Sequence, residues 1–341
     1  MHYMSYETLR TTWWYKTVTA CVLIAVGILI GWWYRGSAEK PQTFKVVRED
    51  SSGYTFIDPL LFTQNSEDTS LPEYASLKKS INEYVAKALS SAEVASTSVY
   101  FRDLNSNLWF GINANEKYTP ASMFKVASLI AFLRKAETNS ELLSSKVKIL
   151  PTSIDLNAFE YYTPADPVKV GQTYTVQDLL TRMIVNSDNI AVRAIDVITG
   201  DELLKKTYTD LQLTQTGTTT NILISPQVYS RIFRVLFNAT YLSHSLSEQT
   251  LSLLSKTTFT QGLVAGVPSD TLVAHKFGEW AEDTKKGTVH ELHDCGIVYY
   301  PKHPYFLCVM TRSQKDFPTL QKVIRDISTM TWNSIQKLYP R

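Results

Sequence analysis

Three short motifs in this chain could together activate a serine. Ser122 is followed by Lys125, Ser187-Asp188-Asn189 forms a second motif, and Lys276-Phe277-Gly278 forms a third. A serine hydroxyl becomes a strong nucleophile when a neighbouring base takes its proton, and a buried or neutral lysine can be that base. The set therefore predicts covalent acyl transfer at a serine.

The first motif depends on its context, because Ser-x-x-Lys also occurs at four other places in the chain. Ser122 alone opens an apolar run, residues 124–133, which predicts a buried helix. Its hydroxyl is then at a helix N-terminus with Lys125 one turn further on the same face. An isolated match of this kind usually marks a capping serine and a lysine that extends to water.

The second motif occurs once, between two apolar stretches with helical spacing, residues 176–185 and 190–197. We expect a helix-loop-helix that aims the Ser187 hydroxyl and the Asn189 amide into a cleft, while Asp188 accepts hydrogen bonds from loop N–H groups. An ordinary capping turn explains the motif equally well when it is taken alone.

The third motif lies at the end of a strand-like run, residues 271–277. A strand can hold the Lys276 ammonium at the floor of a cleft, and Gly278 lets a substrate backbone approach closely. An edge strand protected by a lysine is the simpler alternative.

Together the motifs resemble those of the penicillin-recognising serine hydrolases, and among them the class A β-lactamases. The likeness extends from about Val99 to the C-terminus. It implies that Ser122 is the acylated nucleophile and Lys125 its base. It further implies that Ser187 relays a proton and that Lys276 holds the substrate carboxylate and tunes Ser187.

The same resemblance assigns substrate-binding positions. Asn189 binds the side-chain amide of the substrate, and Phe277, Gly278 and Glu279 form the strand side of the site. The backbone N–H groups of Ser122 and Glu279 make the oxyanion hole.

Two positions depart from the family's anchor for a substrate carboxylate. Phe277 stands where the family usually has a hydroxyl, and Cys295 stands where many members have an arginine. The anchor is weakened unless another residue, such as Arg312, replaces it.

A third departure concerns hydrolysis of the acyl-enzyme. The chain has no Asp or Glu between Leu211 and Ser247, where the family's Ω-loop carries the glutamate that activates water. We therefore expect acylation to be retained and deacylation to be slow.

The N-terminal part predicts a membrane anchor. Residues 17–33 are uncharged and are flanked by tryptophan and tyrosine on both sides. A helix over residues 13–34 covers roughly 33 Å, enough for the hydrocarbon core. A cleaved signal peptide is the alternative. The flanking charges weakly favour a cytoplasmic domain, but the substrates of the resembled family lie outside the cell membrane. We expect a single-pass protein with an extracytoplasmic catalytic domain.

Composition agrees with one enzyme-sized domain behind this anchor. The 341 residues carry a net charge of +2, which gives no basic field for nucleic acid. We expect a cytoplasmic stub and anchor over residues 1–40, a linker with one docking segment over 41–71, and the hydrolase domain over 72–341. The expected fold is α+β in three α/β/α layers, with an antiparallel sheet from both chain ends and an inserted all-helical lobe.

Metal and cofactor chemistry is not predicted. His290 and His293 are three residues apart in an apparent strand and so point to opposite faces, whereas the metalloprotease motif needs four residues on a helix. The chain has no P-loop and no dinucleotide fingerprint.

We also expect two free, buried thiols. A tight turn at Lys302 and His303 leaves Cys295 and Cys308 as diagonal neighbours on adjacent strands, too far apart for a disulfide.

The chain is thus expected to be a membrane-tethered serine hydrolase that β-lactams acylate at Ser122. A peptidase acting on cell-wall peptides that end in D-alanyl-D-alanine is one alternative. A non-catalytic sensor or scaffold for such peptides is another.

Overall fold

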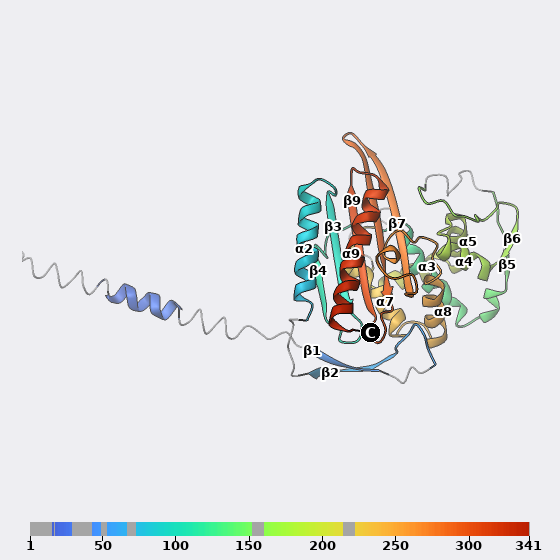
Figure 1. The fold of residues 1–341 in the computed structure, drawn as a ribbon. Coiled ribbons are helices and arrows are strands. Elements are labelled where there is room, and N and C mark those ends of the chain that lie inside the picture. Colours follow the sequence, from blue (N-terminus) through green and yellow to red (C-terminus); the bar gives the residue numbers. More distant parts are fainter. Residues whose placement is uncertain are drawn as a thin grey trace, which may run out of the picture. The chain divides into compact units, whose positions relative to one another are not determined.

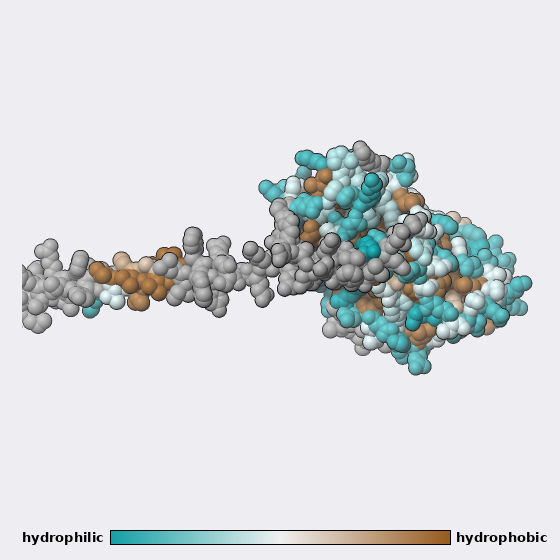
Figure 2. All heavy atoms as spheres, turned by 90° about the horizontal axis from the view of Figure 1, so that it is seen from below, coloured by the Kyte–Doolittle hydropathy of each residue, from teal (hydrophilic) through white to brown (hydrophobic). Residues whose placement is uncertain are grey.

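The computed structural model describes residues 16, 18–28, 43–48, 53–66, 73–151, 160–213 and 222–340. Most of them belong to one compact unit, Phe44–Asn65 with Ser70–Arg341. Outside this unit, residues 16 and 18–28 are helical and exposed, and Figure 2 shows their surface as largely hydrophobic. No helix within the described residues is long and apolar enough to cross a membrane. The expected span of residues 13–34 lies partly outside the described residues.

A five-stranded antiparallel sheet forms the centre of the compact unit (Figure 1). Its order is β4-β3-β9-β8-β7, so β3, from the first half of the chain, pairs with β9, which lies near its end. The strands are β3 (Ser96–Asp103), β4 (Trp109–Ile112), β7 (Val273–Thr284), β8 (Gly287–Val298) and β9 (Tyr305–Ser313). The expected sheet from both chain ends is confirmed, and β7 forms one edge of it.

Helices cover both faces of the sheet, as expected for the α+β fold. On one face α2 (Ala75–Ser90) and α9 (Phe317–Leu338) pack together, and their apolar residues recur every three or four positions (Figure 1). On the other face α7 (Pro226–Phe237) contacts β3, β8 and β9. Two hydrophobic clusters result, one on each side of the sheet.

The chain between β4 and β7 supplies the inserted lobe. Its helical elements are η1 (Ala121–Phe124), α3 (Lys125–Ala136), η2 (Ser140–Leu143), α4 (Val176–Val185), α5 (Asn189–Thr199), α6 (Asp201–Asp210), α7, α8 (His244–Leu254) and η3 (Val264–Gly266). The lobe is not all helical, because β5 (Lys146–Lys148) and β6 (Thr173–Thr175) form a small antiparallel pair.

The predicted docking segment contacts the inserted lobe. The Glu248 carboxylate in α8 accepts hydrogen bonds from the backbone N–H groups of Thr55, Phe56 and Ile57 at 2.8–3.0 Å. The Phe56 ring packs edge-on against Tyr299, with ring centroids 5.3 Å apart. On either side of the segment, β1 (Thr43–Arg48) and β2 (Leu60–Ser66) form a two-stranded sheet that the sequence did not predict.

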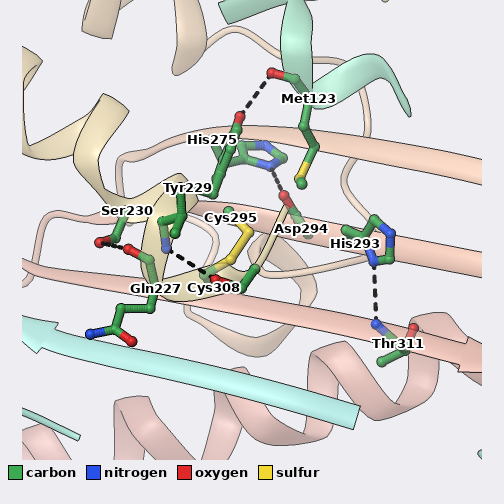
Figure 3. The surroundings of a disulfide bond; sticks show 12 residues. Met123, Gln227, Tyr229, Ser230, His275, His293, Asp294, Cys295, Cys308 and Thr311 are labelled. Carbon is green, nitrogen blue, oxygen red and sulfur yellow. Dashed lines mark hydrogen bonds and ion pairs between the residues drawn. A yellow bond between two sulfur atoms is a disulfide. The ribbon is translucent and has the colours of Figure 1, made fainter. Parts of the chain in front are cut away.

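The prediction of two free thiols is wrong. Cys295 and Cys308 are directly paired across β8 and β9 and form a disulfide (Figure 3). The prediction assumed a two-residue turn, whereas the connection between Val298 and Tyr305 is a wider loop. Tyr300 lies in this loop and packs against Trp332 in α9, with ring centroids 5.0 Å apart. The register is shifted accordingly, and the two cysteines face each other.

Candidate active site

Ser122 lies in η1, directly before α3, and its side chain is buried at the end of that helix. Lys125, one turn further on, donates a hydrogen bond from Nζ to Ser122 Oγ at 2.6 Å. This is the contact that the Ser-x-x-Lys spacing predicted. Lys125 is therefore placed to take the proton of Ser122.

Ser187 lies between two lysines from opposite sides of the site. Lys125 Nζ donates to Ser187 Oγ at 3.1 Å and also to the Ser187 carbonyl oxygen. Lys276 Nζ, from β7, donates to the same Oγ at 2.9 Å. The four residues predicted to be catalytic are thus brought together, with the Ser187 hydroxyl joining both lysines.

The turn that presents Ser187 is under strain and is held by its neighbour. Ser187 has φ of 59°, in the left-handed region that a residue with a side chain seldom adopts. Asp188 caps α5, where its Oδ1 accepts from Ala191 N at 2.8 Å, and its Oδ2 accepts from Val168 N at 2.8 Å. The predicted role of Asp188 in holding this loop is confirmed.

Burial destabilises the protonated form of both lysines and so lowers their pKa. Desolvation lowers the pKa of Lys125 to about 8, although the nearby Glu160, Asp188 and Glu279 carboxylates act in the opposite direction. Desolvation, and then repulsion from Lys125, hold the pKa of the fully buried Lys276 well below its ordinary value. Lys125 can therefore lose its proton at mildly alkaline pH, as a catalytic base must.

Gly278 allows the nucleophile segment to pack against β7. A Cβ at this position would lie 2.5 Å from the Pro120 carbonyl oxygen and 2.9 Å from Met123 Cγ. The glycine is thus required by the close approach of the chain around Ser122, and not only by the approach of a substrate backbone that its position in the sequence suggested. The same packing brings Ser122 beside the strand that carries Glu279.

Phe277 presents no polar group to the site, because its side chain is buried among other rings. It stacks on Phe259 at a centroid distance of 4.4 Å and meets Tyr162 edge-on at 5.5 Å. Lys276 Nζ lies 4.2 Å from the centre of the Phe277 ring. The position that usually carries a hydroxyl is therefore part of an apolar cluster.

Arg312, suggested above as a replacement for the missing carboxylate anchor, pairs with groups of the protein itself. Its guanidinium donates to Glu291 Oε1 at 2.6 Å and to the Lys117 carbonyl oxygen at 2.8 Å. The other oxygen of Glu291 accepts from Thr119 N at 2.9 Å. Arg312 and Glu291 together hold the segment that leads to Ser122. The Arg312 guanidinium is thus already bound within the protein.

Glu160 is part of the site, although the predicted set of site residues did not include it. Its Oε1 accepts from Asn189 Nδ2 at 2.7 Å and lies 3.9 Å from Lys125 Nζ. Burial raises the pKa of this carboxyl, and Lys125 acts against that rise. No motif surrounds Glu160 and it lies outside regular secondary structure, so only the folded chain shows its position.

The Glu279 side chain contacts the segment that follows Glu160. Its Oε1 accepts from Tyr162 N at 2.9 Å. Burial raises the pKa of the Glu279 carboxyl to about 7, and hydrogen bonding to Tyr162 opposes that rise. Residues 160–162 thus connect to α5 through Asn189 and to β7 through Glu279.

The fold and this arrangement agree with the comparisons with known proteins. The profile of the beta-lactamase enzyme family matches residues 76–335. The chain belongs to this family and is a serine hydrolase of the β-lactamase kind.

Individual relatives are distant. A β-lactamase of Streptomyces fradiae is 24% identical over 242 residues, covering 66% of this chain and 76% of the relative. The structure of PBP-A superposes with a TM-score of 0.64 at 22% identity, over 77% of this chain and 97% of PBP-A. A PBP-A mutant solved as an acyl-enzyme complex with penicillin G has the same TM-score and identity, over 79% of this chain and 100% of that one.

Proposed function

We propose that this chain is a membrane-anchored serine hydrolase that β-lactams acylate at Ser122 and that releases the acyl group slowly. The observation that carries the proposal is the position of Lys125 Nζ, 2.6 Å from Ser122 Oγ and 3.1 Å from Ser187 Oγ. The penicillin G acyl-enzyme of the related PBP-A mutant supports the same chemistry.

Acylation follows from these contacts. Ser122 Oγ bonds to the β-lactam carbonyl carbon while its proton passes to Lys125. The backbone N–H groups of Ser122 and Glu279 stabilise the oxyanion. The ring C–N bond then breaks, and Ser187 passes a proton from the lysines to the leaving nitrogen. The product is an ester on Ser122 with the opened ring attached.

Slow deacylation follows from the missing carboxylate at the Ω-loop position. The chain has no carboxylate between Leu211 and Ser247, so that segment supplies no base for water. Losing a positioned general base typically costs roughly 10²–10⁴-fold in rate. Glu160 Oε1 accepts a hydrogen bond from Asn189 and lies 3.9 Å from Lys125 Nζ, so this carboxyl is engaged on the Lys125 side of the site. The acyl-enzyme should therefore persist.

Intact-protein mass spectrometry over time with excess penicillin G tests this proposal. We expect one adduct per chain that persists for minutes or longer, that is absent in Ser122→Ala, and that remains in the control Ser140→Ala, where an exposed serine is replaced. The absence of any adduct or turnover would favour the non-catalytic sensor. Fast turnover that disappears in Glu160→Gln would show that Glu160 is the deacylating base.

We further propose that the catalytic domain lies outside the cytoplasmic membrane, anchored by residues 17–33. The belts of tryptophan and tyrosine on both sides of this apolar stretch support an anchor. Protease added to intact cells should cut the domain as it cuts an exported control protein. Protection of the domain while the control is cut would contradict this location.

A further inference from the structure

The amide of Asn189 already has an acceptor in this structure. Its Nδ2 donates to Glu160 Oε1 at 2.7 Å, a hydrogen bond to an acidic side chain and so among the stronger kinds when that carboxyl is ionised. The family resemblance gives this amide to a carbonyl on the substrate side chain. The amide nitrogen carries two N–H donors, so this bond does not by itself exclude such a carbonyl, but it holds Glu160 beside the place where the carbonyl would bind.

The second oxygen of the same carboxyl awaits a donor. Among the residues that the structure describes, Glu160 Oε2 is buried and has no hydrogen-bond partner. The side chain is only 14% exposed, so solvent reaches it poorly. An ionised carboxylate can only accept hydrogen bonds, and an unsatisfied buried acceptor is costly. A ligand group that donates hydrogen bonds is favoured here and a carbonyl is not.

This acceptor lies close to the nucleophile. Glu160 Oε1 is 3.9 Å from Lys125 Nζ, which in turn is 2.6 Å from Ser122 Oγ. A group bound by the Glu160 carboxyl is therefore close enough to Ser122 to be a substituent on a carbon near the scissile carbonyl of a substrate. A remote part of a long substrate does not occupy this place.

We infer that Glu160 is a specificity residue that recognises a free amino group on the carbon next to the scissile carbonyl. The preferred substrates are amino-acid amides, peptides with a free amine at that carbon, and β-lactams that carry an unacylated amine. An amino group donates hydrogen bonds in both its neutral and its protonated form, so it satisfies Oε2. This inference rests on the proposed acylation of Ser122 and identifies the substrate class of that reaction.

The chemistry of acylation is unchanged by this choice of substrate. Ser122 still gives its proton to Lys125, and the leaving nitrogen still receives a proton through Ser187, so no further reactant is needed. A protonated amine would in addition take over from Lys125 as the positive partner of Glu160. Because Glu160 raises the pKa of Lys125, that exchange favours the neutral, basic form of the lysine.

Two penicillins test the inference directly. Penicillin G and 6-aminopenicillanic acid share the fused ring and the carboxylate, but the first carries an acylated amine and the second a free amine. Second-order acylation rate constants of the full chain in detergent are measured for both by intact-protein mass spectrometry. The quantity of interest is the rate constant for 6-aminopenicillanic acid divided by that for penicillin G.

Glu160→Gln is the informative variant, because glutamine keeps the size and one acceptor oxygen but adds a donor and loses the charge. We expect this ratio to fall by about tenfold to a hundredfold, the usual worth of one hydrogen bond to a charged group. Glu202→Gln, which removes an exposed carboxylate in α6, is the matched control and should leave the ratio unchanged. Glu160→Asp keeps the charge and should keep most of the preference for the amine.

Three results would overturn the inference. An equal ratio in the wild type and Glu160→Gln would show that the carboxylate does not recognise the amine. Faster acylation by penicillin G in Glu160→Gln, with no change for 6-aminopenicillanic acid, would show that Glu160 only blocks the cleft. If Glu160→Gln does not fold, as judged by thermal unfolding, loss of the preference in a folded Glu160→Asp would count equally against it. If neither compound labels the wild type, the proposed function itself fails and this inference falls with it.

Discussion

The rate of Ser122 acylation should depend on pH through Lys125. The pKa of Lys125 is lowered to about 8, and only the neutral amine can accept the proton of Ser122. Roughly half of the lysine is neutral at pH 8, about a tenth at pH 7 and about a hundredth at pH 6, because each pH unit changes the ratio tenfold. The rate constant should therefore rise about tenfold per unit below pH 8 and level off above it.

Mass spectrometry of samples quenched at set times, between pH 6 and 10.5, measures this profile for the wild type and for Glu160→Gln. The Glu160 carboxylate raises the pKa of Lys125, so its removal should move the inflection to lower pH. The exposed Glu202→Gln control should not move it. A rate that is flat from pH 6 to 9, or one that still rises near pH 10, would refute Lys125 as a base tuned by burial. An inflection that stays in place in Glu160→Gln would refute the electrostatic link between these side chains.

Three further predictions concern single features of the site and sheet. Phe277→Thr should lower the free energy of unfolding by about 3 kcal/mol, because it removes a ring stacked on Phe259. Chemical denaturation measures this, and an unchanged denaturant concentration at the midpoint of unfolding would contradict it. Gly278→Ala should slow acylation about tenfold or more by pushing the nucleophile segment from β7, whereas an unchanged rate constant in a folded variant would show that the segment adapts. Replacing both Cys295 and Cys308 by alanine should cost about 3 kcal/mol of stability for a loop of this length. Alkylation of the denatured wild type without reductant, read by mass spectrometry, should leave both cysteines unmodified, and two alkylated thiols would contradict the disulfide.

The sequence predicted the elements and the core of the site because both depend on local patterns. The apolar periodicity over 176–185 predicted α4 with the bounds observed, and the spacing of Ser122 and Lys125 predicted their contact. The strand-like runs at the two ends of the domain predicted a sheet made from both chain ends, although the order of its strands was not predicted.

The features that the sequence did not predict depend on the course of loops and on distant packing. The register of β8 and β9 was misjudged because Tyr300 packs on α9 and widens the connecting loop. Nothing in the sequence around Arg312 shows that Glu291, on the neighbouring strand, binds it. The position of Glu160 likewise depends on the course of residues 160–168. This segment is hydrogen-bonded to the start of α5 and, through Glu279, to β7.

The place of β9 in the sheet has a consequence for synthesis. β9 lies between β3 and β8, yet about 200 residues separate the end of β3 from its start. At the usual elongation rates of about 5–20 residues per second, a ribosome needs roughly 10–40 s to make that interval. During this time the β3–β4 hairpin exists without the strand that covers its inner edge, and Lys276 has not yet met Ser187. The nascent chain therefore cannot complete its central sheet until this last strand emerges.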